Sequence, residues 1–397
     1  MKIALISPAS FPATQFGGIV FLTIDLAREI SNLGHDVTIF TSDLDFSDKE
    51  KFFNKKLSRL EKFQKFKINR NHSWFAIKLF FITPSIYFEL KRYKPDIIHT
   101  IGLRSFQSFI AWIISKQYGI PLVVSDQGGL TTHPFLKDSS FVFKIIIKFQ
   151  NFFIKKFLKD SASISSANEY ESKIFLQLYD KSNLTIIRNG VNLESLKSIH
   201  DFQKKYAINS KYFLFVGRFS KSKGIENLLK AIIMIKSKLV ERKISLVMIG
   251  SDFGFGNEMK KIILENQLSD VIKIFNNIPR EDVISAYPQS EFLVLPSNWE
   301  LSPLVPLESF AFKKPVISIN THGIPFTVKH NVNGLLVEPE NPLKLSESII
   351  NLIDDPQLRE KLGLSGYDFV HKECNCITMA EKTLELYSKI LNNKKNS

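Results

Sequence analysis

Short apolar runs alternate along the chain with longer stretches in which apolar residues recur every three or four positions. The short runs predict buried strands, and the longer stretches predict helices with one apolar face. Because strands that alternate with helices are typical of parallel sheets covered on both faces, the chain is predicted to be an α/β protein. The expected strands span residues 3–6, 37–40, 97–99, 122–125, 161–165 and 185–187 in the first half, and 213–216, 245–249, 272–275, 292–295, 316–319 and 335–337 in the second.

This scheme occurs twice, on either side of a polar stretch at residues 189–211. The stretch begins with Asn-Gly-Val-Asn, which ends the preceding strand, so we expect the linker there. With 397 residues, of which 44% are hydrophobic, the chain is long enough for two cores of ordinary size. We therefore expect two Rossmann-like, doubly wound parallel-sheet domains, residues 1–188 and 189–371, facing each other across a cleft.

Two glutamates follow the strand expected at residues 292–295. Glu300 lies in the loop that leaves this strand, and Glu308 lies in a helix expected at 304–312, with Pro303 near its first turn. Open α/β sheets bind ligands at the carboxyl ends of their strands. A carboxylate there can accept two hydrogen bonds from a ribose or sugar diol, and the helix N-terminus attracts phosphate. A glutamate pair at this spacing is also common on solvated helices.

A basic loop follows the strand expected at residues 213–216 and precedes a helix expected at about 225–238. Gly217 permits a tight turn there, and Arg218 and Lys223 can converge on one anionic group. Arginine supplies a planar fork for phosphate oxygens, and lysine supplies a compact charge. The loop is therefore predicted to clamp a diphosphate without a metal. The alternative is that both cations belong to an ordinary solvated loop.

Together these segments resemble the retaining glycosyltransferases of family 4 (glycosyl transferases group 1), which have the GT-B fold. The resemblance implies a hexosyltransferase-type enzyme (EC 2.4) that transfers sugar from a nucleotide diphosphate-sugar with retention of anomeric configuration. It also implies that the first domain binds the acceptor, that the second binds the donor, and that residues 372–397 pack back on the first domain. The matching segments cover nearly the whole chain: residues 2–7, Gly17-Gly18, 33–37, 186–191, Gly217-Arg218, Lys223-Gly224, Glu300 with Glu308, 314–317 and 333–337.

The resemblance gives catalytic roles to three of these residues. Arg218 and Lys223 neutralise the two donor phosphates, and their effect grows as negative charge collects on the leaving oxygen. Glu300 lies beside the donor sugar. In such enzymes the donor phosphate accepts the proton of the acceptor hydroxyl on the same face, so no protein nucleophile is required. No metal and no other cofactor is expected, and the nucleotide-sugar is a co-substrate.

The resemblance also assigns substrate-binding positions. Glu308 corresponds to the residue that holds the ribose hydroxyls, and the backbone amides of Leu304 and Val305 complete the phosphate cradle. Gly17 and Gly18 let a loop of the first domain approach donor and acceptor closely. An ordinary turn between a strand and a helix would use the same glycine pair.

Some positions depart from the family pattern. Where members often carry a histidine that contacts the donor sugar, this chain has Gln127, followed by His133. Gln127 could take over that contact, His133 could reach in, or neither acts. Asn276 stands where a glycine often precedes the base-binding turn, and Pro303 replaces a frequent glycine. The segment 321–326 lacks the usual carboxylate. These departures concern the choice of sugar and base.

Basic residues are distributed unevenly. Residues 1–200 carry 27 Lys and Arg against 17 Asp and Glu, whereas residues 201–397 carry 26 against 22. The excess gathers at 49–70, where nine basic residues alternate with phenylalanines and leucines, and at 141–158, where lysines recur at helical spacing beside phenylalanines. Such segments suit an anionic membrane surface, near which each basic residue contributes about 1 kcal/mol. The alternative is a buried aromatic stripe with a solvated basic rim.

The remaining features bear on location and partners. The start of the chain lacks a signal-peptide layout, and no apolar run of about 20 residues spans a membrane. Cys374 and Cys376 are expected to remain reduced thiols. No nucleic-acid module is recognisable. We expect a cytoplasmic enzyme, peripherally attached to the inner face of the cell membrane, that glycosylates a lipid-linked saccharide in cell-envelope polysaccharide or lipopolysaccharide synthesis. The alternatives are a soluble enzyme with a small acceptor and a silent nucleotide-binding subunit.

Overall fold

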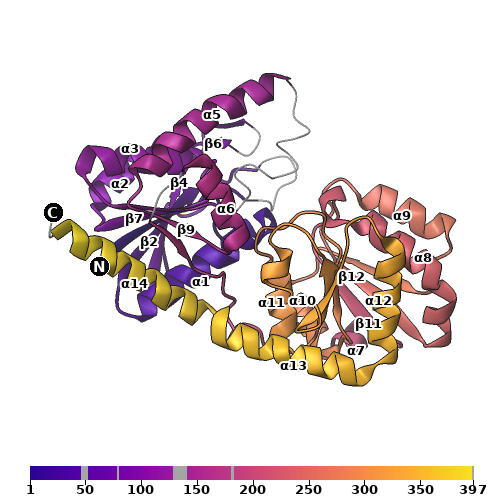
Figure 1. Ribbon diagram of the computed structural model, residues 1–397. Coiled ribbons are helices and arrows are strands. Elements are labelled where there is room, and N and C mark those ends of the chain that lie inside the picture. Colours follow the sequence, from indigo (N-terminus) through magenta and orange to yellow (C-terminus); the bar gives the residue numbers. More distant parts are fainter. Residues whose placement is uncertain (46–51, 78–79, 128–140, 180–182, 396–397) are drawn as a thin grey trace. The chain divides into compact units, whose positions relative to one another are not determined.

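The computed structural model describes residues 1–45, 52–77, 80–127, 141–179 and 183–395 (Figure 1). The chain divides into two compact units. The first combines Met1–Gly190 with Cys376–Ser397, and the second is Val191–Asn375. The boundaries lie after Gly190 and after Asn375, whereas the expected domains end at residues 188 and 371.

The first unit is built on an eight-stranded sheet with the order β10-β9-β8-β7-β1-β2-β4-β3. Its neighbouring strands are parallel except for the β3–β4 pair. A separate antiparallel hairpin joins β5 (Phe75–Ile77) to β6 (Phe80–Ile82). The strands of the sheet are β1 (Lys2–Ile6), β2 (Asp36–Ser42), β3 (Leu60–Phe63), β4 (Phe66–Asn71), β7 (Ile97–Ile101), β8 (Leu122–Ser125), β9 (Ser163–Ser166) and β10 (Leu184–Ile186).

Helices cover both faces of this sheet (Figure 1). On one face, α1 (Gly18–Asn32) packs beside α14 (Cys376–Lys395), the last helix of the chain. On the other face lie α2 (Ile86–Tyr93) and α3 (Phe106–Tyr118), with α5 (Phe141–Asp160) packed on α3. Helix α6 (Glu169–Leu178) connects β9 to β10.

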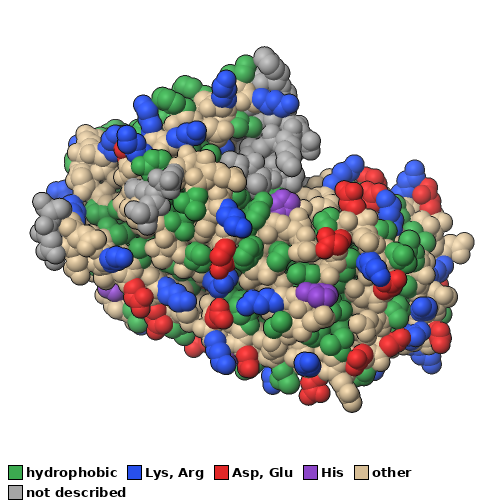
Figure 2. Space-filling view, in the orientation of Figure 1, with side chains coloured by type: hydrophobic (Ala, Val, Ile, Leu, Met, Phe, Trp, Pro, Cys, Tyr) green, Lys and Arg blue, Asp and Glu red, His purple; other side chains and the backbone are tan. Residues whose placement is uncertain are grey.

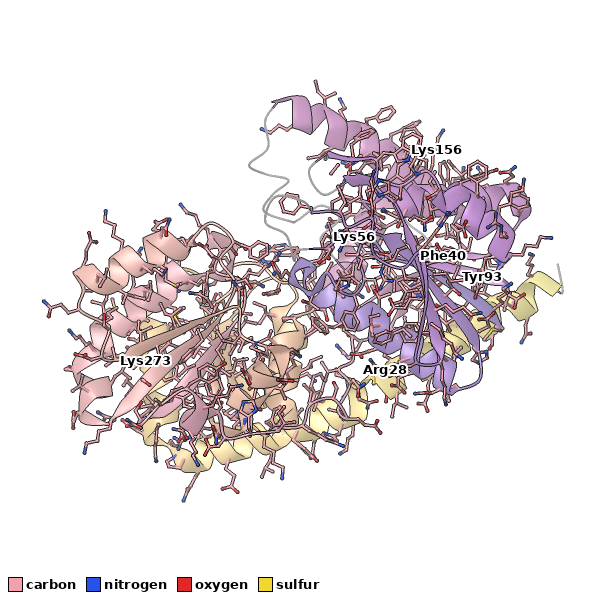
Figure 3. All side chains as sticks on the ribbon, turned by 180° about the vertical axis from the view of Figure 1, so that it is seen from behind. Arg28, Phe40, Lys56, Tyr93, Lys156 and Lys273 are labelled. Carbon is pink, nitrogen blue, oxygen red and sulfur yellow. The ribbon has the colours of Figure 1, made fainter. Side chains whose placement is uncertain are left out.

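Tyr93, at the end of α2, ties this helix to the sheet. Its ring packs edge-on against Phe40 of β2, with 5.3 Å between the ring centroids (Figure 3). Its one hydroxyl hydrogen is shared between the carbonyl oxygens of Ile3 and Asp36, which lie 3.3 and 3.2 Å from the hydroxyl oxygen. Burial raises the pKa of Tyr93, so the hydroxyl stays protonated.

The second unit is built on a fully parallel six-stranded sheet with the order β13-β12-β11-β14-β15-β16. Its strands are β11 (Lys211–Val216), β12 (Ile244–Gly250), β13 (Ile272–Asn276), β14 (Leu293–Leu295), β15 (Val316–Ile319) and β16 (Gly334–Val337). Its helices are α7 (Phe202–Lys205), α8 (Ile225–Glu241), α9 (Gly256–Glu265), α10 (Arg280–Gln289), α11 (Leu304–Ala311), α12 (Pro342–Asp354) and α13 (Pro356–Glu373).

This second sheet is apolar on both faces. Successive residues of a strand point to opposite faces, and residues 212–215 of β11 meet helices on both faces. Phe213 and Phe215 pack with α8, α9 and α12, whereas Tyr212 and Leu214 pack with α7, α10, α11 and α13. All four side chains are fully buried, as the uninterrupted apolar run of β11 predicts for a central parallel strand.

The strands predicted from the apolar pattern are confirmed, with ends that differ by a few residues. The pattern does not predict β3 to β6. In β3 and β4, lysines and other polar residues interrupt the apolar ones, so no apolar run marks these strands, and β5 and β6 form a separate pair outside the sheet. The prediction of a linker at residues 189–211 is wrong for most of that stretch. Leu196 and Phe202 of this stretch are buried in the core of the second unit, so most of the stretch belongs to that unit.

Helix α5 buries one side and exposes apolar residues on another. Phe157 is buried and packs against Trp112 of α3, whereas Ile145, Phe149 and Phe152 are more than half exposed. Lysines lie beside them, and Lys156 projects from α5 in Figure 3, its ammonium 4.6 Å from the ring of Phe152. In Figure 2, basic and hydrophobic side chains lie next to one another over this part of the first unit. The buried-stripe alternative therefore describes only part of the helix.

Candidate active site

The order of the strands in the second unit creates a switch point between β11 and β14. From β11 the chain adds β12 and β13 on one side, and then continues with β14 on the other. The loops that leave β11 and β14 at their carboxyl ends therefore diverge, and this is where open α/β sheets bind ligands. These loops contain Arg218, Lys223 and Glu300, so the structure places the three predicted catalytic residues at one edge of the sheet.

The two loops are held together by their backbones. Asn298 donates its backbone N–H to the carbonyl oxygen of Ser222, at 3.0 Å. Gly224 has a φ of 64°, and a Cβ there would lie 1.9 Å from the carbonyl oxygen of Pro296. A third loop is attached through the N–H of Gly323, which donates to the carbonyl oxygen of Glu300 at 3.0 Å. The loop geometry is therefore set by main-chain contacts.

Lys223 and Glu300 contact each other directly. The Nζ atom of Lys223 donates to Oε1 of Glu300, and less than a fifth of either side chain is exposed. The pair joins the loop after β11 to the loop after β14, with each charge compensated by the other. A lysine and a carboxylate in contact at a switch point offer one cation and one hydrogen-bond acceptor to a bound ligand.

Arg218 is exposed and does not share that contact. Its guanidinium carbon lies 5.1 Å from the ring centroid of Phe253, in the loop after β12. This cation–π contact orients the side chain along the carboxyl edge of the sheet. Arg218 and Lys223 thus belong to one loop, but in this structure their side chains have different partners.

The N-terminus of α11 begins at Leu304. Pro303 is its N-cap residue and makes no side-chain cap hydrogen bond. The first N–H groups of a helix have no partner inside the helix, and here the third position is Pro306, which has no N–H. The free donors of the first turn are therefore the backbone amides of Leu304 and Val305, the two predicted to face a phosphate.

Glu308 lies inside α11 and is 6% exposed. Its Oε2 atom accepts a hydrogen bond from the hydroxyl of Tyr287 at 2.7 Å and one from Arg280 Nη1 at 3.3 Å. Its Oε1 atom contacts Nη2 of Arg280. The carboxylate predicted to hold a ribose is therefore already engaged by two protein side chains.

Asn276 is the last residue of β13 and is exposed. It lies in register with Gly250, the last residue of β12. A Cβ at Gly250 would lie 1.9 Å from the carbonyl oxygen of Gly217, so only glycine fits where β11 and β12 end. The close approach of these strand ends requires Gly250, a position that the sequence analysis does not identify.

In the first unit, Gly17 and Gly18 begin α1. Gly17 has a φ of 116° and is the N-cap residue, without a side-chain cap hydrogen bond. This backbone conformation is open mainly to glycine. The loop before it is anchored by Arg70, a buried residue whose guanidinium donates to the carbonyl oxygen of Phe11 at 2.8 Å. An uncapped helix N-terminus beside a fixed loop is compatible with close approach of a ligand.

Gln127 follows β8 with a φ of 57°. Its side-chain amide is paired in both directions with Asn189, at 2.7 and 2.9 Å, and its N–H donates to Oε1 of Glu171. Burial, with a contribution from Asp126, raises the pKa of Glu171 to about 8. The amide of Gln127 thus already has a protein partner. His133, the other candidate for the sugar contact, lies outside the described residues.

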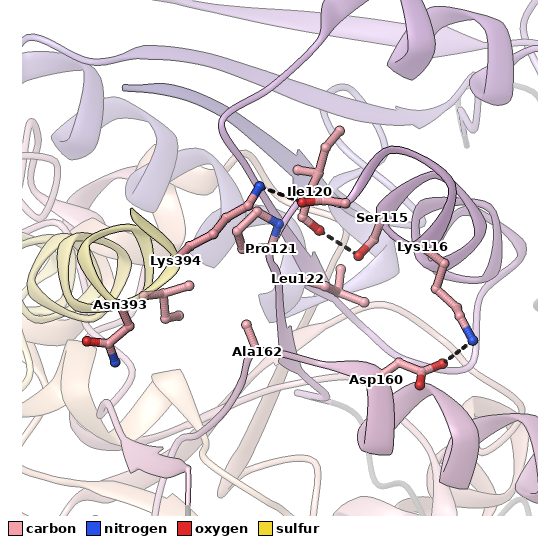
Figure 4. Close-up of a pocket in the computed structure, with 11 residues that line it drawn as sticks. Ser115, Lys116, Ile120, Pro121, Leu122, Asp160, Ala162, Asn393 and Lys394 are labelled. Atoms are coloured by element: carbon pink, nitrogen blue, oxygen red, sulfur yellow. Dashed lines mark hydrogen bonds and ion pairs between the residues drawn. The ribbon is translucent and has the colours of Figure 1, made fainter. Parts of the chain in front are cut away.

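A cavity of about 580 Å³ lies elsewhere in the first unit, at the amino ends of β8 and β9 (Figure 4). Lys116 pairs with Asp160 at its wall, at 3.0 Å, and Lys394 of α14 donates to the carbonyl oxygen of Gly119 at 2.6 Å. The described site residues of this unit, Gly17, Gly18 and Gln127, follow the carboxyl ends of its strands. The cavity is therefore separate from them.

In the described part of the chain, no group of three or more His, Cys, Asp and Glu side chains could hold a metal ion. No helix in the same residues combines the length and the apolar character needed to cross a membrane. Cys374 and Cys376 are both free and buried.

Two family models match consecutive parts of the chain. The model described as Glycosyltransferase Family 4 matches residues 16–195, and the model described as Glycosyl transferases group 1 matches residues 198–369. An uncharacterised glycosyltransferase of Methanocaldococcus jannaschii is 34% identical over 195 residues, about half the length of each chain (48% and 50%). A D-inositol 3-phosphate glycosyltransferase of Corynebacterium diphtheriae is 24% identical and is matched over 93% of this chain and 90% of its own.

Solved structures share the architecture. Sucrose-phosphate synthase of Thermosynechococcus elongatus has a TM-score of 0.79 at 22% identity, over 99% of both chains. Anabaena HepE in complex with UDP and glucose has a TM-score of 0.74 at 16% identity, over 98% of this chain and 99% of its own. WaaG, a glycosyltransferase involved in lipopolysaccharide biosynthesis, has a TM-score of 0.69 at 14% identity, over 97% and 99%. At these identities the likeness concerns the fold, which is GT-B.

Proposed function

The chain belongs to the glycosyltransferases of family 4 (glycosyl transferases group 1), and from this premise we propose a retaining transfer of sugar from a nucleotide diphosphate-sugar to a saccharide acceptor. The contact of Lys223 with Glu300 at the β11–β14 switch point carries the proposal. A cation for the diphosphate and an acceptor for sugar hydroxyls meet there. The free backbone amides at the start of α11 follow the same strand, β14. UDP-glucose is the first donor to test, because HepE was solved with UDP and glucose.

In the proposed reaction, the acceptor hydroxyl oxygen attacks the anomeric carbon from the face that the phosphate leaves. The bond from the anomeric carbon to the phosphate oxygen breaks, and its electron pair stays with the nucleotide diphosphate. The acceptor proton passes to that phosphate oxygen. Lys223, Arg218 and the amides of Leu304 and Val305 stabilise the charge that develops on the leaving group. Glu300 orients the sugar through its hydroxyls.

We also propose that Lys223, Arg218 and the α11 amides take the place of a divalent cation in neutralising the diphosphate. The purified protein is then expected to retain full turnover in EDTA. Activity that disappears in EDTA and returns with added Mg²⁺ or Mn²⁺ would contradict this part of the proposal.

The transferase proposal is tested by nucleotide release. Purified protein incubated with UDP-, GDP- and ADP-sugars is expected to release free nucleotide slowly by hydrolysis with one donor and faster with the acceptor present. NMR of the product is expected to show the anomeric configuration of the donor. A protein that binds nucleotide but neither hydrolyses nor transfers any donor would instead be a silent nucleotide-binding subunit. An inverted product would refute retention.

For the acceptor we propose a lipid-linked saccharide, reached from an anionic membrane surface on the inner face of the cell membrane. Support comes from α5, whose exposed Ile145, Phe149 and Phe152 lie on one helical face while the opposite side is used for packing on α3. Exposed lysines surround this face, among them Lys148 and Lys155. An apolar strip flanked by cations is typical of interfacial helices. The lipopolysaccharide enzyme WaaG shares the fold.

Vesicle sedimentation tests this surface. The protein is expected to sediment with vesicles that contain anionic lipid, less so as salt rises, and hardly with zwitterionic vesicles. Replacing Phe149 and Phe152 by Ser should remove sedimentation, whereas Leu264→Ser, at an equally exposed leucine of α9, should not. Sedimentation that is indifferent to lipid charge and to the α5 changes would remove the membrane proposal.

A second acceptor class is favoured by the named relatives. The corynebacterial relative is a D-inositol 3-phosphate glycosyltransferase, and the neighbour from Thermosynechococcus is a sucrose-phosphate synthase. Inositol 3-phosphate should therefore be offered beside lipid-linked saccharides. Transfer to it in the absence of lipid would replace the lipid-linked acceptor by a small phosphorylated one.

A further inference from the structure

Three donor hydrogens reach the carboxylate of Glu308 from the residues that the structure describes. Nη2 of Arg280 contacts Oε1, Nη1 of Arg280 lies 3.3 Å from Oε2, and the Tyr287 hydroxyl lies 2.7 Å from Oε2. A carboxylate has about four lone-pair positions for hydrogen bonds, two on each oxygen. Both positions on Oε2 are therefore occupied, and one position remains, on Oε1.

Tyr287 is fixed in this arrangement. Its ring is completely buried and stacks on Phe312, with 5.9 Å between the centroids and 7° between the planes. Burial and the neighbouring Glu308 carboxylate raise the pKa of Tyr287, so its hydroxyl remains a donor. A hydroxyl on a packed ring restricts the torsion of the Glu308 carboxylate that it contacts.

Arg280 approaches the same carboxylate from the first turn of α10. Its two terminal nitrogens address the two carboxylate oxygens, the fork geometry that arginine forms with carboxylates. About 39% of its side chain is exposed, compared with 8% for Glu308. The guanidinium is thus the more exposed partner of this ion pair.

We propose that Arg280 and Tyr287 are positioning residues that leave Glu308 one acceptor site, so that Glu308 recognises a single ribose hydroxyl and not the ribose diol. The inference rests on the proposed function and on the expected role of Glu308 in holding the ribose of the donor. It adds that the two ribose hydroxyls contribute unequally to binding, and that Arg280 and Tyr287 cause the inequality.

Calorimetric binding of UDP, 2′-deoxy-UDP and 3′-deoxy-UDP tests the proposal. In the wild type, loss of the recognised hydroxyl should raise Kd by about 10-fold or more, as expected for a hydrogen bond to a charged group, and loss of the other by less than about 3-fold. Equal penalties for the two deoxy nucleotides would overturn the proposal.

Two variants examine the positioning residues. Arg280→Gln frees acceptor sites on both oxygens, so the two penalties should become equal within about 2-fold. Tyr287→Phe frees a site on Oε2 and lets the carboxylate turn, so the ratio of the penalties should also fall; KM for the donor should rise while kcat is kept. Arg280 is partly exposed, and its replacement remains informative if Tyr287→Phe does not fold. Unchanged ratios in Arg280→Gln refute the inference.

Glu308→Gln separates this inference from the proposed function. If Glu308 holds the ribose, Glu308→Gln should reduce the larger penalty strongly. A Glu308→Gln protein that keeps the wild-type penalties means that Glu308 does not hold the ribose. This outcome overturns the inference, whereas the proposed sugar transfer is tested separately by nucleotide release. If the donor screen identifies GDP or ADP as the nucleotide, the 2′-deoxy and 3′-deoxy forms of that nucleotide replace those of UDP. A wild-type protein that binds none of the three nucleotide diphosphates contradicts both proposals. If Glu308→Gln loses the larger penalty but Arg280→Gln and Tyr287→Phe keep the wild-type ratio of the two penalties, Glu308 holds the ribose and only the positioning by Arg280 and Tyr287 is overturned.

Discussion

At the scale of single residues, the candidate site depends on partners that lie far apart in the chain. Lys223 and Glu300 are separated by 77 positions and meet because β11 and β14 are neighbours in the sheet. Each of these charges is held close to an opposite one in the absence of ligand, which limits their movement before a substrate binds. Arg218, in contrast, is exposed and contacts an aromatic ring.

This difference makes Arg218 a clean target for substitution. Arg218→Ala removes an exposed cation and should leave stability nearly unchanged, but it should cost roughly 2–4 kcal/mol of transition-state stabilisation if the guanidinium reaches the leaving diphosphate. The measurement is kcat/KM for the donor. Lys221→Ala is the matched control, since Lys221 is exposed in the same loop and pairs with Glu258 at 3.7 Å. Equal rates for the two variants would contradict the role of Arg218.

Glu171 gives a prediction about pH. Burial, together with Asp126, raises its pKa from 4.5 to about 8 in the folded protein. The folded state then binds more protons than the unfolded state between these values, so this group makes the free energy of unfolding decrease as pH rises from about 4.5 to 8, by up to about 1.4 kcal/mol per pH unit. Glu171→Gln should flatten the pH dependence of urea unfolding. The control is Glu169→Gln, because Glu169 lies on the same helix as Glu171 and pairs with Arg188 at 3.3 Å; this variant should keep the wild-type slope.

The sequence predicts which residues lie at the carboxyl ends of strands better than it predicts their partners. Glu300, Lys223 and the amides of Leu304 and Val305 are at the expected edge, because strand ends and helix starts are local features. The partners of Glu308 have no local pattern. Tyr287 reaches Glu308 from a neighbouring helix, and the pairing of Gln127 with Asn189 joins residues 62 positions apart.

At the scale of elements, strands with a buried apolar run are predictable, and strands β3 and β4, in which charged residues interrupt the apolar ones, are not. A central strand such as β11 is apolar from Tyr212 to Val216, because both of its faces are covered there. In β3 the burial alternates between exposed and half-buried residues, and the charged residues there resemble a solvated loop. The lysine-rich segment therefore contains a strand pair that β-propensity alone does not predict.

Glycine positions connect these elements to the site. Gly224 and Gly119 have nearly equal φ values, 64° and 63°, but a Cβ at Gly224 would collide with the backbone of Pro296, whereas one at Gly119 would meet nothing within 4 Å. Replacing either by Ala has a similar conformational cost, so the difference between them reports the steric clash. We expect Gly224→Ala to lower the free energy of unfolding by about 1–3 kcal/mol more than Gly119→Ala, measured in urea.

The activity of the Gly224→Ala variant provides a second measurement. The clash should move the loop that carries Lys223 relative to the loop that carries Glu300, so kcat should fall even where the protein remains folded. Similar stability and activity in the two variants would show that the loops after β11 and β14 tolerate a shift.

At the scale of the whole molecule, the first unit is made of two segments that are far apart in the chain. Helix α14 belongs to this unit, and its Tyr387 is completely buried. The Tyr387 hydroxyl lies 2.6 Å from Nδ1 of His99 in β7, and Nε2 of His99 lies 3.1 Å from the hydroxyl of Ser125. Burial lowers the pKa of His99 to about 3, so the ring is neutral at physiological pH.

This buried contact should measure how strongly α14 is attached. Tyr387→Phe removes the hydroxyl and leaves a ring nitrogen of His99 without its partner, so the free energy of unfolding of the first unit should fall by about 1–3 kcal/mol. Tyr118→Phe, at an exposed tyrosine of the same unit, should have little effect. Equal denaturation midpoints for the two variants would mean that this contact contributes nothing measurable to the docking of α14.

The division of the first unit between both ends of the chain also affects its biosynthesis. A ribosome releases residues 1–190 long before it has translated α14, and until then Ile3, Leu5 and their neighbours lack the helix that completes their core. The second unit, which is continuous in sequence, can mature first. Nascent chains that stop before residue 376 should therefore be the ones that chaperones retain and proteases remove.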